Sequence, residues 1–339
     1  MRTVVTERDI VEVEVKPRDM IVEYRRLLDQ DVQARLLEGL VDCQCPGCLA
    51  DSASVAFTRS GLQYKHCGVC SSLYVAPRPP EEVLEAFHRN APAALFWQEK
   101  ILPATQDARR EKLYQPRVQW LLDVVDEYRP QAKTCLAVGY HNRLLIEELQ
   151  ALTGEDLAIT VANPSADIEF AGADLPQVTV RATGITQLTG LEPADLILAF
   201  DILDRSHDPE QLFAAAAAAL APGGLLLATT TLGSGFDVQM LWEEAENIYP
   251  PERLNLFSVE GLTQLCQRHG FEIMEFSTPG FFDVETVRHA VDARPDGPWP
   301  RFVRYLAEMR DGEALQALQE YLQRFRLSSF GRIALQKPV

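Results

Sequence analysis

The sequence predicts a doubly wound α/β fold that carries a small metal-binding segment near its N-terminus. Two observations lead to this prediction. From about residue 133 onwards, short apolar runs alternate with helical patterns, which is the arrangement of a parallel sheet covered by helices on both faces. Ahead of this region, five of the seven cysteines lie within residues 43–70. A chain of 339 residues is long enough for one large domain with smaller attachments.

The elements of the α/β region follow from apolar runs and helix-breaking residues. The segment APGG at 221–224 is expected to end a helix and turn into a strand. A helical stretch at 283–327 precedes a closing strand, FGRIALQKP. The remaining predicted strands are 134–139, 157–163, 177–182, 195–202, 224–231 and 271–278, and the helices are 142–152, 208–220 and 259–270.

The N-terminal part reads differently. Residues 3–15 alternate charge and valine, which predicts one or two short strands. Residues 19–41 place apolar side chains at helical spacing, and the prolines before Glu81 start a further helix.

The overall charge limits the class of partner. With 49 acidic against 32 basic residues, the net charge is −17, which opposes binding to nucleic acid or to an anionic membrane. No apolar run approaches the roughly 20 residues of a membrane span, and the first residues lack a secretory-signal pattern. A cysteine cluster without a disulfide pattern suits a reducing compartment. We therefore expect a cytoplasmic protein that binds neither nucleic acid nor membrane.

Two Cys-x2-Cys pairs form the most specific motif. Cys45 and Cys48 (CPGC) are separated by 18 residues from Cys67 and Cys70 (CGVC). Each pair places two thiolates on one tight turn, and two such turns complete a tetrahedral shell around Zn²⁺. Because protein ligands would fill all four positions, the predicted metal is structural. The alternative is a set of four unrelated buried thiols. Cys43 has the wrong spacing to share a turn and is left out of the ligand set.

Four further segments carry a family resemblance when they are taken in order. They are YVAPRPPEEVLEAF (74–87), RREKLYQPR (109–117), DLILAFDILDRSHDPEQLFAAAAAALAPGGLLLATT (195–230) and PPERLNLFSVEGLTQLCQRHGFEIMEFSTPG (250–280). With the cysteine pairs, this order resembles bacterial class I S-adenosylmethionine (SAM)-dependent methyltransferases that have an N-terminal zinc ribbon. The resemblance implies a seven-stranded Rossmann-like sheet whose last strand is antiparallel and inserted between its neighbours.

The resemblance also implies a division of the chain into four parts. We expect an N-terminal strand and helix segment, a zinc ribbon, a helical linker and a methyltransferase-like domain with a helical insertion before its last strand. The corresponding ranges are 1–42, 43–76, 77–130 and 131–339, with the insertion at 283–327.

The turn after the first strand departs from the family pattern. That pattern is acid-x-Gly-x-Gly-x-Gly, in which the glycines make the turn, admit the ligand and let the helix pack closely. In this chain the acid is replaced by Ala137, and only Gly139 remains of the glycines, because His141 and Arg143 replace the other two. The turn could be a damaged cofactor site, a differently used site or a plain strand–helix connection.

The other cofactor positions are mixed. Asn163 stands where the family has a ribose-binding acid, so it would bind the hydroxyls without charge assistance. The turn with Asp201 and Asp204 is close to the family pattern. The resemblance thus implies that SAM, where it is bound, is held by Val138, Gly139, His141, Asn163, Asp201 and Asp204.

The segment NIYPPERLN is where the resemblance places the acceptor, with Tyr249, Arg253 and Asn255 as substrate-binding candidates. Arg253 replaces a histidine of the family, so no general base is assigned. A guanidinium suits an anionic acceptor such as a phosphate or carboxylate on a sugar or metabolite. The competing interpretation is a surface arginine paired with Glu252 or another acid.

Two functions therefore compete. The first is a SAM-dependent methyltransferase acting on a small-molecule or sugar-type acceptor with an eroded cofactor motif. The second is a non-catalytic scaffold or regulatory subunit of the same fold that binds a protein partner. A nucleic-acid-binding ribbon is disfavoured by the charge.

Overall fold

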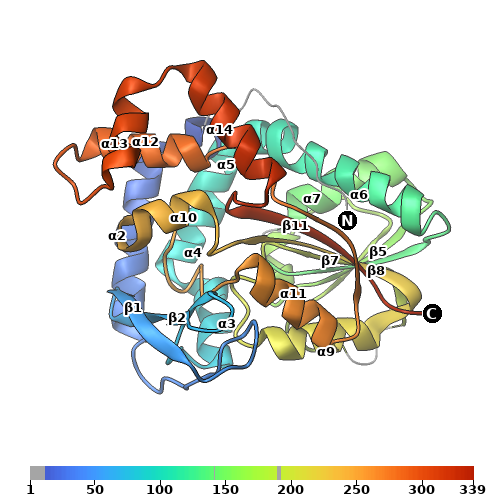
Figure 1. The fold of residues 1–339 in the computed structure, drawn as a ribbon. Helices are drawn as coiled ribbons and strands as arrows, with labels where there is room; N and C mark the ends of the chain where they lie inside the picture. The colour runs from blue at the N-terminus through green and yellow to red at the C-terminus, as the bar shows by residue number, and fades with distance from the viewer. Residues whose placement is uncertain (1–11, 141, 189–191) are drawn as a thin grey trace.

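A seven-stranded sheet forms the centre of the computed structural model, which describes residues 12–140, 142–188 and 192–339 (Figure 1). The strand order is β10-β11-β8-β7-β4-β5-β6, and β11 runs antiparallel to both of its neighbours. This order confirms the predicted doubly wound fold with an inserted last strand. The strands are β4 (Thr134–Val138), β5 (Ala158–Ala162), β6 (Val178–Arg181), β7 (Ala194–Phe200), β8 (Leu220–Thr231), β10 (Glu272–Ser277) and β11 (Phe330–Gln336).

Helices cover both faces of this sheet because its strands are apolar on both sides. In β4, Leu136 and Val138 belong to one buried cluster, whereas Cys135 and Ala137 belong to another. The first cluster includes side chains of α9 (Pro209–Ala219) and α11 (Val259–Arg268). The second includes side chains of α6 (Gln115–Tyr128), α7 (Arg143–Thr153) and the short α8 (Ala166–Glu169).

Two local predictions are wrong. The predicted helix stop is confirmed, since α9 ends at Ala219, but the next strand starts earlier than residue 224. β8 begins at Leu220 and includes APGG, with a register shift between Ala194 and Leu196. Residues 12–15, predicted as strand, form the helix α1 (Glu12–Val15). The Glu12 carboxylate pairs with Lys16 at 3.0 Å, and this i,i+4 pair supports the helical turn. The rest of the predicted strand, residues 3–11, lies outside the described ranges.

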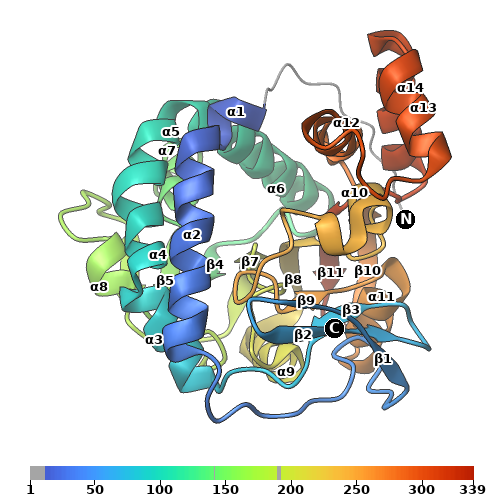
Figure 2. The same cartoon turned by 90° about the vertical axis from the view of Figure 1, so that its left-hand side faces the viewer.

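The N-terminal part forms a helical layer and a second sheet (Figure 2). This sheet has the order β1-β2-β3-β9, in which β9 (Asn255–Leu256) comes from the far part of the chain. The other elements are α2 (Arg18–Arg35), β1 (Ala53–Arg59), β2 (Leu62–Cys67), β3 (Leu73–Val75), α3 (Glu81–Asn90), α4 (Pro92–Phe96), the π-helix η1 (Trp97–Ile101), α5 (Leu102–Arg109) and the π-helix η2 (Arg110–Tyr114).

Three helices precede β11, as predicted for the insertion. They are α12 (Asp283–Ala293), α13 (Arg301–Met309) and α14 (Gly312–Arg324), and α12 packs beside α10 (Phe236–Leu241) (Figure 2). The 3-10 helix η3 (Trp242–Glu244) directly follows α10 in the sequence. Among the described helices, none combines the length and apolar character needed to cross a bilayer. The division into four parts stays a prediction.

Candidate functional site

The first turn of the predicted cofactor site follows β4, at the point where the strand order reverses. Gly139 has φ +134°, a conformation that favours glycine, and its N–H donates to the Ala162 carbonyl at 3.1 Å. The Val138 side chain is buried in the core cluster with Leu136. Tyr140 is 8% exposed, and its ring centroid lies 4.6 Å from that of His88 on α3. His141 lies outside the described residues.

Asn142 and Arg143 follow in this turn and point to different surroundings. Arg143 donates to the Glu147 carboxylate at 2.8 Å and to the Glu169 carbonyl, along its own helix and towards α8. Asn142 stands at the N-cap position of α7 without capping it. Its side chain is 7% exposed, lines the cavity described below, and has no hydrogen-bond partner among the described residues for either its amide oxygen or its amide nitrogen.

The end of β5 carries Asn163, which is completely buried. Its side-chain oxygen accepts from the Ser165 N–H at 2.7 Å, and its amide donates to the Glu169 carboxylate at 3.0 Å. The side-chain oxygen and nitrogen of Asn163 therefore both have hydrogen-bond partners within the turn that follows β5.

Asp201 and Asp204 lie in the turn after β7. Asp201 has φ +55°, and its carboxylate accepts from Arg117 at 2.6 Å and from the Thr229 hydroxyl at 2.9 Å. Although burial alone would raise it, the pKa of Asp201 is lowered to about 2 by the Arg117 guanidinium and the Thr229 hydroxyl. Asp204 is 1% exposed and lies 3.2 Å from Arg253; burial raises its pKa against the opposing effect of that guanidinium.

A cavity of about 70 Å³ opens between these turns. Its lining mixes aromatic rings with charges of both signs: Trp97, Arg109, Tyr114, Arg117, Tyr140, Asn142, Leu145, Phe200, Asp201 and Arg205. Arg117 pairs with Asp201, and Arg205 pairs with Glu252 at 2.8 Å. Arg109 donates to the Val15 carbonyl and the Thr105 hydroxyl, so its hydrogen-bond partners in the described ranges are neutral. The cavity therefore carries a surplus of positive charge within a chain of net charge −17.

Residues 97–117 of the N-terminal helical layer and α6 supply four of the ten lining side chains. Trp97 begins η1 and Tyr114 ends η2, and Arg117 stands one turn further on, in α6. Arg109 stacks over the Trp97 ring at 5.0 Å. Single-turn π-helices are frequent at functional sites because the extra residue re-aims the neighbouring side chains. Here the two π-helices bring an indole and a phenol to the same cavity.

The three residues expected to bind the acceptor lie in different surroundings. Arg253 pairs with Asp204 and also donates to the Glu252 carbonyl at 2.8 Å. Asn255 is completely buried, and its amide donates to the carbonyls of Leu203 and Ser206, which fixes the turn after β7. The Tyr249 ring lies 5.5 Å from the Arg59 guanidinium, on the side of β1.

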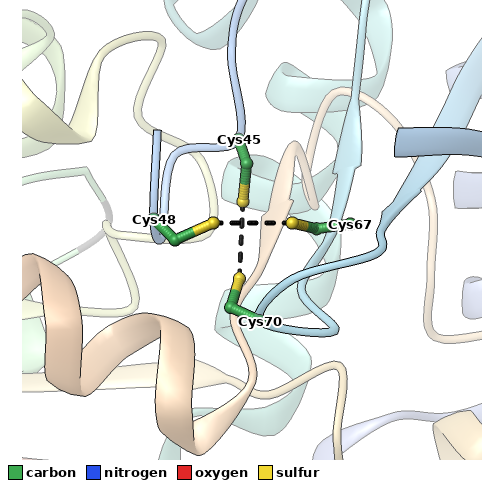
Figure 3. Close-up of side chains that lie close together, drawn as sticks. All are labelled: Cys45, Cys48, Cys67 and Cys70. Carbon is green, nitrogen blue, oxygen red and sulfur yellow. Dashed lines mark hydrogen bonds between the residues drawn. The ribbon is translucent and has the colours of Figure 1, made fainter. Parts of the chain in front are cut away.

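The four predicted metal ligands lie together (Figure 3). The sulfur atoms of Cys45, Cys48, Cys67 and Cys70 all lie within 4.8 Å of one another, and the pairs Cys45–Cys70 and Cys48–Cys67 are 3.5 Å apart. Tetrahedral Zn–S bonds of about 2.3 Å would place the sulfurs about 3.8 Å apart. The donor set and its spacing therefore fit a zinc ion, and Cys43 lies outside the cluster as predicted.

Gly139 follows β4, and Asp201 and Asp204 follow the neighbouring parallel strand β7, so all three lie at the same edge of the sheet. Their role in cofactor binding stays a prediction. The side chains that line the cavity were largely missed: Arg109, Tyr114, Arg117, Asn142 and Arg205. One signal could have found part of this set, because the segment RREKLYQPR contains the first three of them.

A mostly parallel sheet with a polar cavity at its switch point is typical of α/β proteins that bind nucleotides and cofactors. Residues 76–275, more than half of the chain, match the family model described as "Methyltransferase domain". The chain therefore belongs to this methyltransferase family. No curated protein matches its sequence.

Solved structures of similar fold include three complexes. The plantazolicin methyltransferase BpumL in complex with S-adenosylhomocysteine (SAH) is 13% identical, with a TM-score of 0.48, over 76% of this chain and 94% of that one. The O-methyltransferase of a trans-AT PKS multienzyme of Brevibacillus brevis with SAH is 14% identical, with a TM-score of 0.44, over 70% and 76%. Phosphoethanolamine N-methyltransferase 2 of Haemonchus contortus with SAM is 18% identical, with a TM-score of 0.43, over 65% and 53%.

Proposed function

We propose that this chain transfers a methyl group from SAM to a small anionic or sugar-linked acceptor at the cavity between β4 and β7. The single observation that carries the proposal is the lining of that cavity. It combines surplus guanidinium charge with Asn142, whose buried amide has no hydrogen-bond partner in the described ranges. A buried amide without partners costs about 1–3 kcal/mol, so a ligand that satisfies it gains that amount.

The donor set fits the amino-acid end of SAM. A carboxylate group would bind Arg109 or Arg117, and an ammonium group would bind Asp201, whose low pKa keeps it ionised. When bound, SAM supplies an electrophilic methyl group on a sulfonium sulfur. The chain's own residues bind and orient the two reactants, which is the larger part of catalysis in such a displacement. Arg205 and Arg253, each held by a carboxylate, are the proposed contacts for an anionic acceptor.

The nucleoside end of SAM needs more room than this conformation offers. The cavity of about 70 Å³ is several times smaller than the roughly 300–1,000 Å³ of ligand pockets. Asn163 is engaged with Ser165 and Glu169, so it does not face a ribose. We therefore propose that Tyr140 and Asn142 shift when the cofactor binds, and that backbone groups replace part of the missing side-chain contacts.

The test is titration calorimetry with SAM and SAH on the wild-type chain and on Asn142→Ala. We expect binding to the wild type and a loss of about 5- to 30-fold in the variant, the equivalent of one buried hydrogen bond. Arg143→Ala serves as the control, because that side chain points along α7 and towards α8. The absence of heat and of a thermal shift at millimolar SAM and SAH would reject the enzyme proposal.

The same small cavity favours the second candidate function, a non-catalytic scaffold or regulatory subunit that binds a protein partner. The two proposals differ in one measurable way. A scaffold needs no adenosyl ligand, so its thermal stability would not respond to SAH, whereas the enzyme is stabilised in proportion to ligand occupancy.

We also propose that Cys45, Cys48, Cys67 and Cys70 bind one structural Zn²⁺ ion. The support is the sulfur cluster, whose spacing matches a tetrahedral shell with no position left for a substrate. Elemental analysis of the purified chain should find about one zinc per chain. All seven cysteines are free of disulfides, which supports the proposal of a reducing, cytoplasmic location.

A further inference from the structure

The four-cysteine segment shares its sheet with the methyltransferase domain. β9 adds to the edge of β3, with Leu73 opposite Leu256 and Tyr74 opposite Asn255. One residue before β9, the Leu254 carbonyl accepts from the Val75 N–H at 2.8 Å. The strand that follows the last cysteine therefore holds the backbone of the segment that leads to α11.

The metal-ligand turn is fixed to the start of α11. The Ser258 N–H donates to the Ser72 hydroxyl at 3.0 Å, and the Ser258 hydroxyl donates to the Cys70 carbonyl while it caps α11 through the Gly261 N–H. The fit is tight, because a Cβ atom on Gly261 would lie 2.2 Å from the Ser72 oxygen. A shift of the Cys67–Cys70 turn would therefore displace this helix end.

The opposite end of the same sheet holds the segment 243–258, which we call the linking loop. The Tyr64 hydroxyl donates to the Arg253 carbonyl at 2.7 Å. The Arg59 guanidinium donates to the carbonyls of Glu243, Ala245 and Ile248. Of these three residues Ala245 and Ile248 are buried, so their carbonyls would otherwise need other partners.

The other side of the linking loop contacts the turn after β7. The backbone N–H of Leu254, within this loop, donates to the Asp204 carbonyl at 2.6 Å. Glu252 pairs with Arg205 at 2.8 Å, and Arg253 pairs with Asp204 at 3.2 Å. Arg205 lines the cavity. A continuous series of hydrogen bonds and ion pairs thus runs from the cysteine cluster to the proposed ligand site.

We propose that the cysteine-bearing sheet positions the ligand site, so that metal binding and ligand binding are coupled through the linking loop. This inference rests on the proposed zinc and SAM sites. Without the metal, the two turns that carry the four cysteines lose the ion that would join them, and β3 loses the fixed turn that precedes it. The linking loop then loses its backbone partners, and Arg205 loses a fixed Glu252. Because coupling is reciprocal, a cavity ligand should raise the affinity for zinc by the factor that zinc raises the affinity for the ligand.

The first test is amide hydrogen exchange of the full chain with zinc and after chelation. We expect exchange to rise in 43–76 and in the linking loop together, while α7 and α9 keep their protection. SAH affinity, measured on the same two samples, should fall about 5- to 150-fold, the usual range of allosteric coupling. Faster exchange in 43–76 with an unchanged linking loop would overturn the proposal.

A matched pair of variants tests the coupling with the four cysteines intact. Tyr64→Phe removes only the hydroxyl that bonds the Arg253 carbonyl. Tyr74→Phe, on the neighbouring strand, removes a hydroxyl that has no hydrogen bond to the linking loop among the described residues. Zinc content should stay at one equivalent in both, with SAH affinity about 3- to 10-fold weaker in Tyr64→Phe and within about twofold of the wild type in Tyr74→Phe. Equal effects in both variants would count against coupling.

These experiments distinguish a failure of the coupling from a failure of the zinc proposal or of the proposed function. A chain purified without metal would reject the zinc proposal, and the comparison of Tyr64→Phe with Tyr74→Phe would still decide the positioning role. A chain that binds no SAH would reject the proposed function. Hydrogen exchange in the linking loop, with zinc and after chelation, would then still test whether the metal site fixes the loop, because this measurement needs no SAH.

Discussion

The four-cysteine site and the cavity at the switch point both include turns beside strands. They differ in how far apart their residues lie in the sequence. Each cysteine pair spans four residues, and the two pairs face each other across one hairpin-bearing segment. The cavity takes side chains from residue 97 to residue 205. Local spacing therefore determines the first site, whereas tertiary packing determines the second.

The two sites also differ in whether their turns have room for a side chain at a glycine position. The cysteine turns keep their small residues, Gly47 and Gly68, because a Cβ atom at either position would lie 3.1 Å or less from neighbouring atoms. The cofactor turn has lost glycines, but Arg143 points away from the cavity and leaves Asn142 there instead. Replacement of a glycine in a turn is harmless where the new side chain can point to solvent or to its own helix.

The largest expected effect is loss of the metal site. Cys67→Ser removes one thiolate of four, and we expect zinc to fall from about one equivalent to almost none, because a structural zinc site needs all its ligands. Unfolding by denaturant should show a loss of several kcal/mol, since metal binding supplies folding free energy. Cys43→Ser, outside the cluster, is the control. Retention of a full zinc equivalent in Cys67→Ser would mean that local spacing does not define this site.

The next effect concerns the ion pair between Arg117 and Asp201, which both line the cavity. In Arg117→Gln, Asp201 loses the guanidinium that lowers its pKa to about 2. The folded pKa lies below the ordinary value, so the pair contributes stability above about pH 4 that is lost as the pH falls towards 2. After allowance for the partial exposure of Asp201, we expect a loss of about 1–2 kcal/mol at pH 7.

The measurement for this pair is the free energy of unfolding at several pH values between 2 and 7. The difference between wild type and Arg117→Gln should shrink as the solution becomes more acidic. Arg110→Gln removes a different guanidinium from the same helical layer, which pairs with Glu147 and Glu148, and so controls for charge loss. A constant difference across the range would show that Asp201 is not the partner that matters.

The sequence predicted the sheet well because its strands are consecutive apolar runs with short connections. The inserted β11 came from the family resemblance, since a closing apolar strand has no intrinsic direction. The start of β8 was misplaced because proline and two glycines indicate a turn before the strand, whereas Leu220, ahead of them, already pairs with Ala194. Helix α1 was read as strand because period-two alternation over four residues also suits one helical turn.

The cavity could not be predicted to the same degree. Arg109 and Arg117 lie on separate helical elements joined by a π-helix, and the facing of such residues depends on the extra residue in that turn. Asn142 is only the first residue of a predicted helix in the sequence, and nothing there indicates that its side chain lines a cavity instead of capping the helix. By contrast, the grouping of the four cysteines could be predicted without knowledge of distant packing.

A smaller effect is expected at the end of β5. Asn163→Asp restores the acid of the family pattern but places a carboxylate beside that of Glu169, which now accepts from the Asn163 amide at 3.0 Å. We expect a loss of about 1 kcal/mol in the free energy of unfolding from the lost bond and the repulsion. Glu169→Gln in the same chain should restore most of it. If Asn163→Asp alone instead strengthens SAH binding tenfold without loss of stability, the turn is still arranged for a ribose.

The smallest effect is expected at Arg143, the residue that replaces the last glycine of the family turn. Its guanidinium is partly exposed and bonds Glu147 on the same helix, an arrangement worth about 0.3–0.5 kcal/mol. Arg143→Ala should therefore change stability by no more than that and SAH affinity by less than about twofold, as measured by denaturant unfolding and calorimetry. Arg117→Gln in parallel provides the contrast from inside the cavity. Should Arg143→Ala strengthen SAH binding markedly, the guanidinium would have to occupy cofactor space in solution, and the erosion of the glycine turn would be the feature that limits this enzyme.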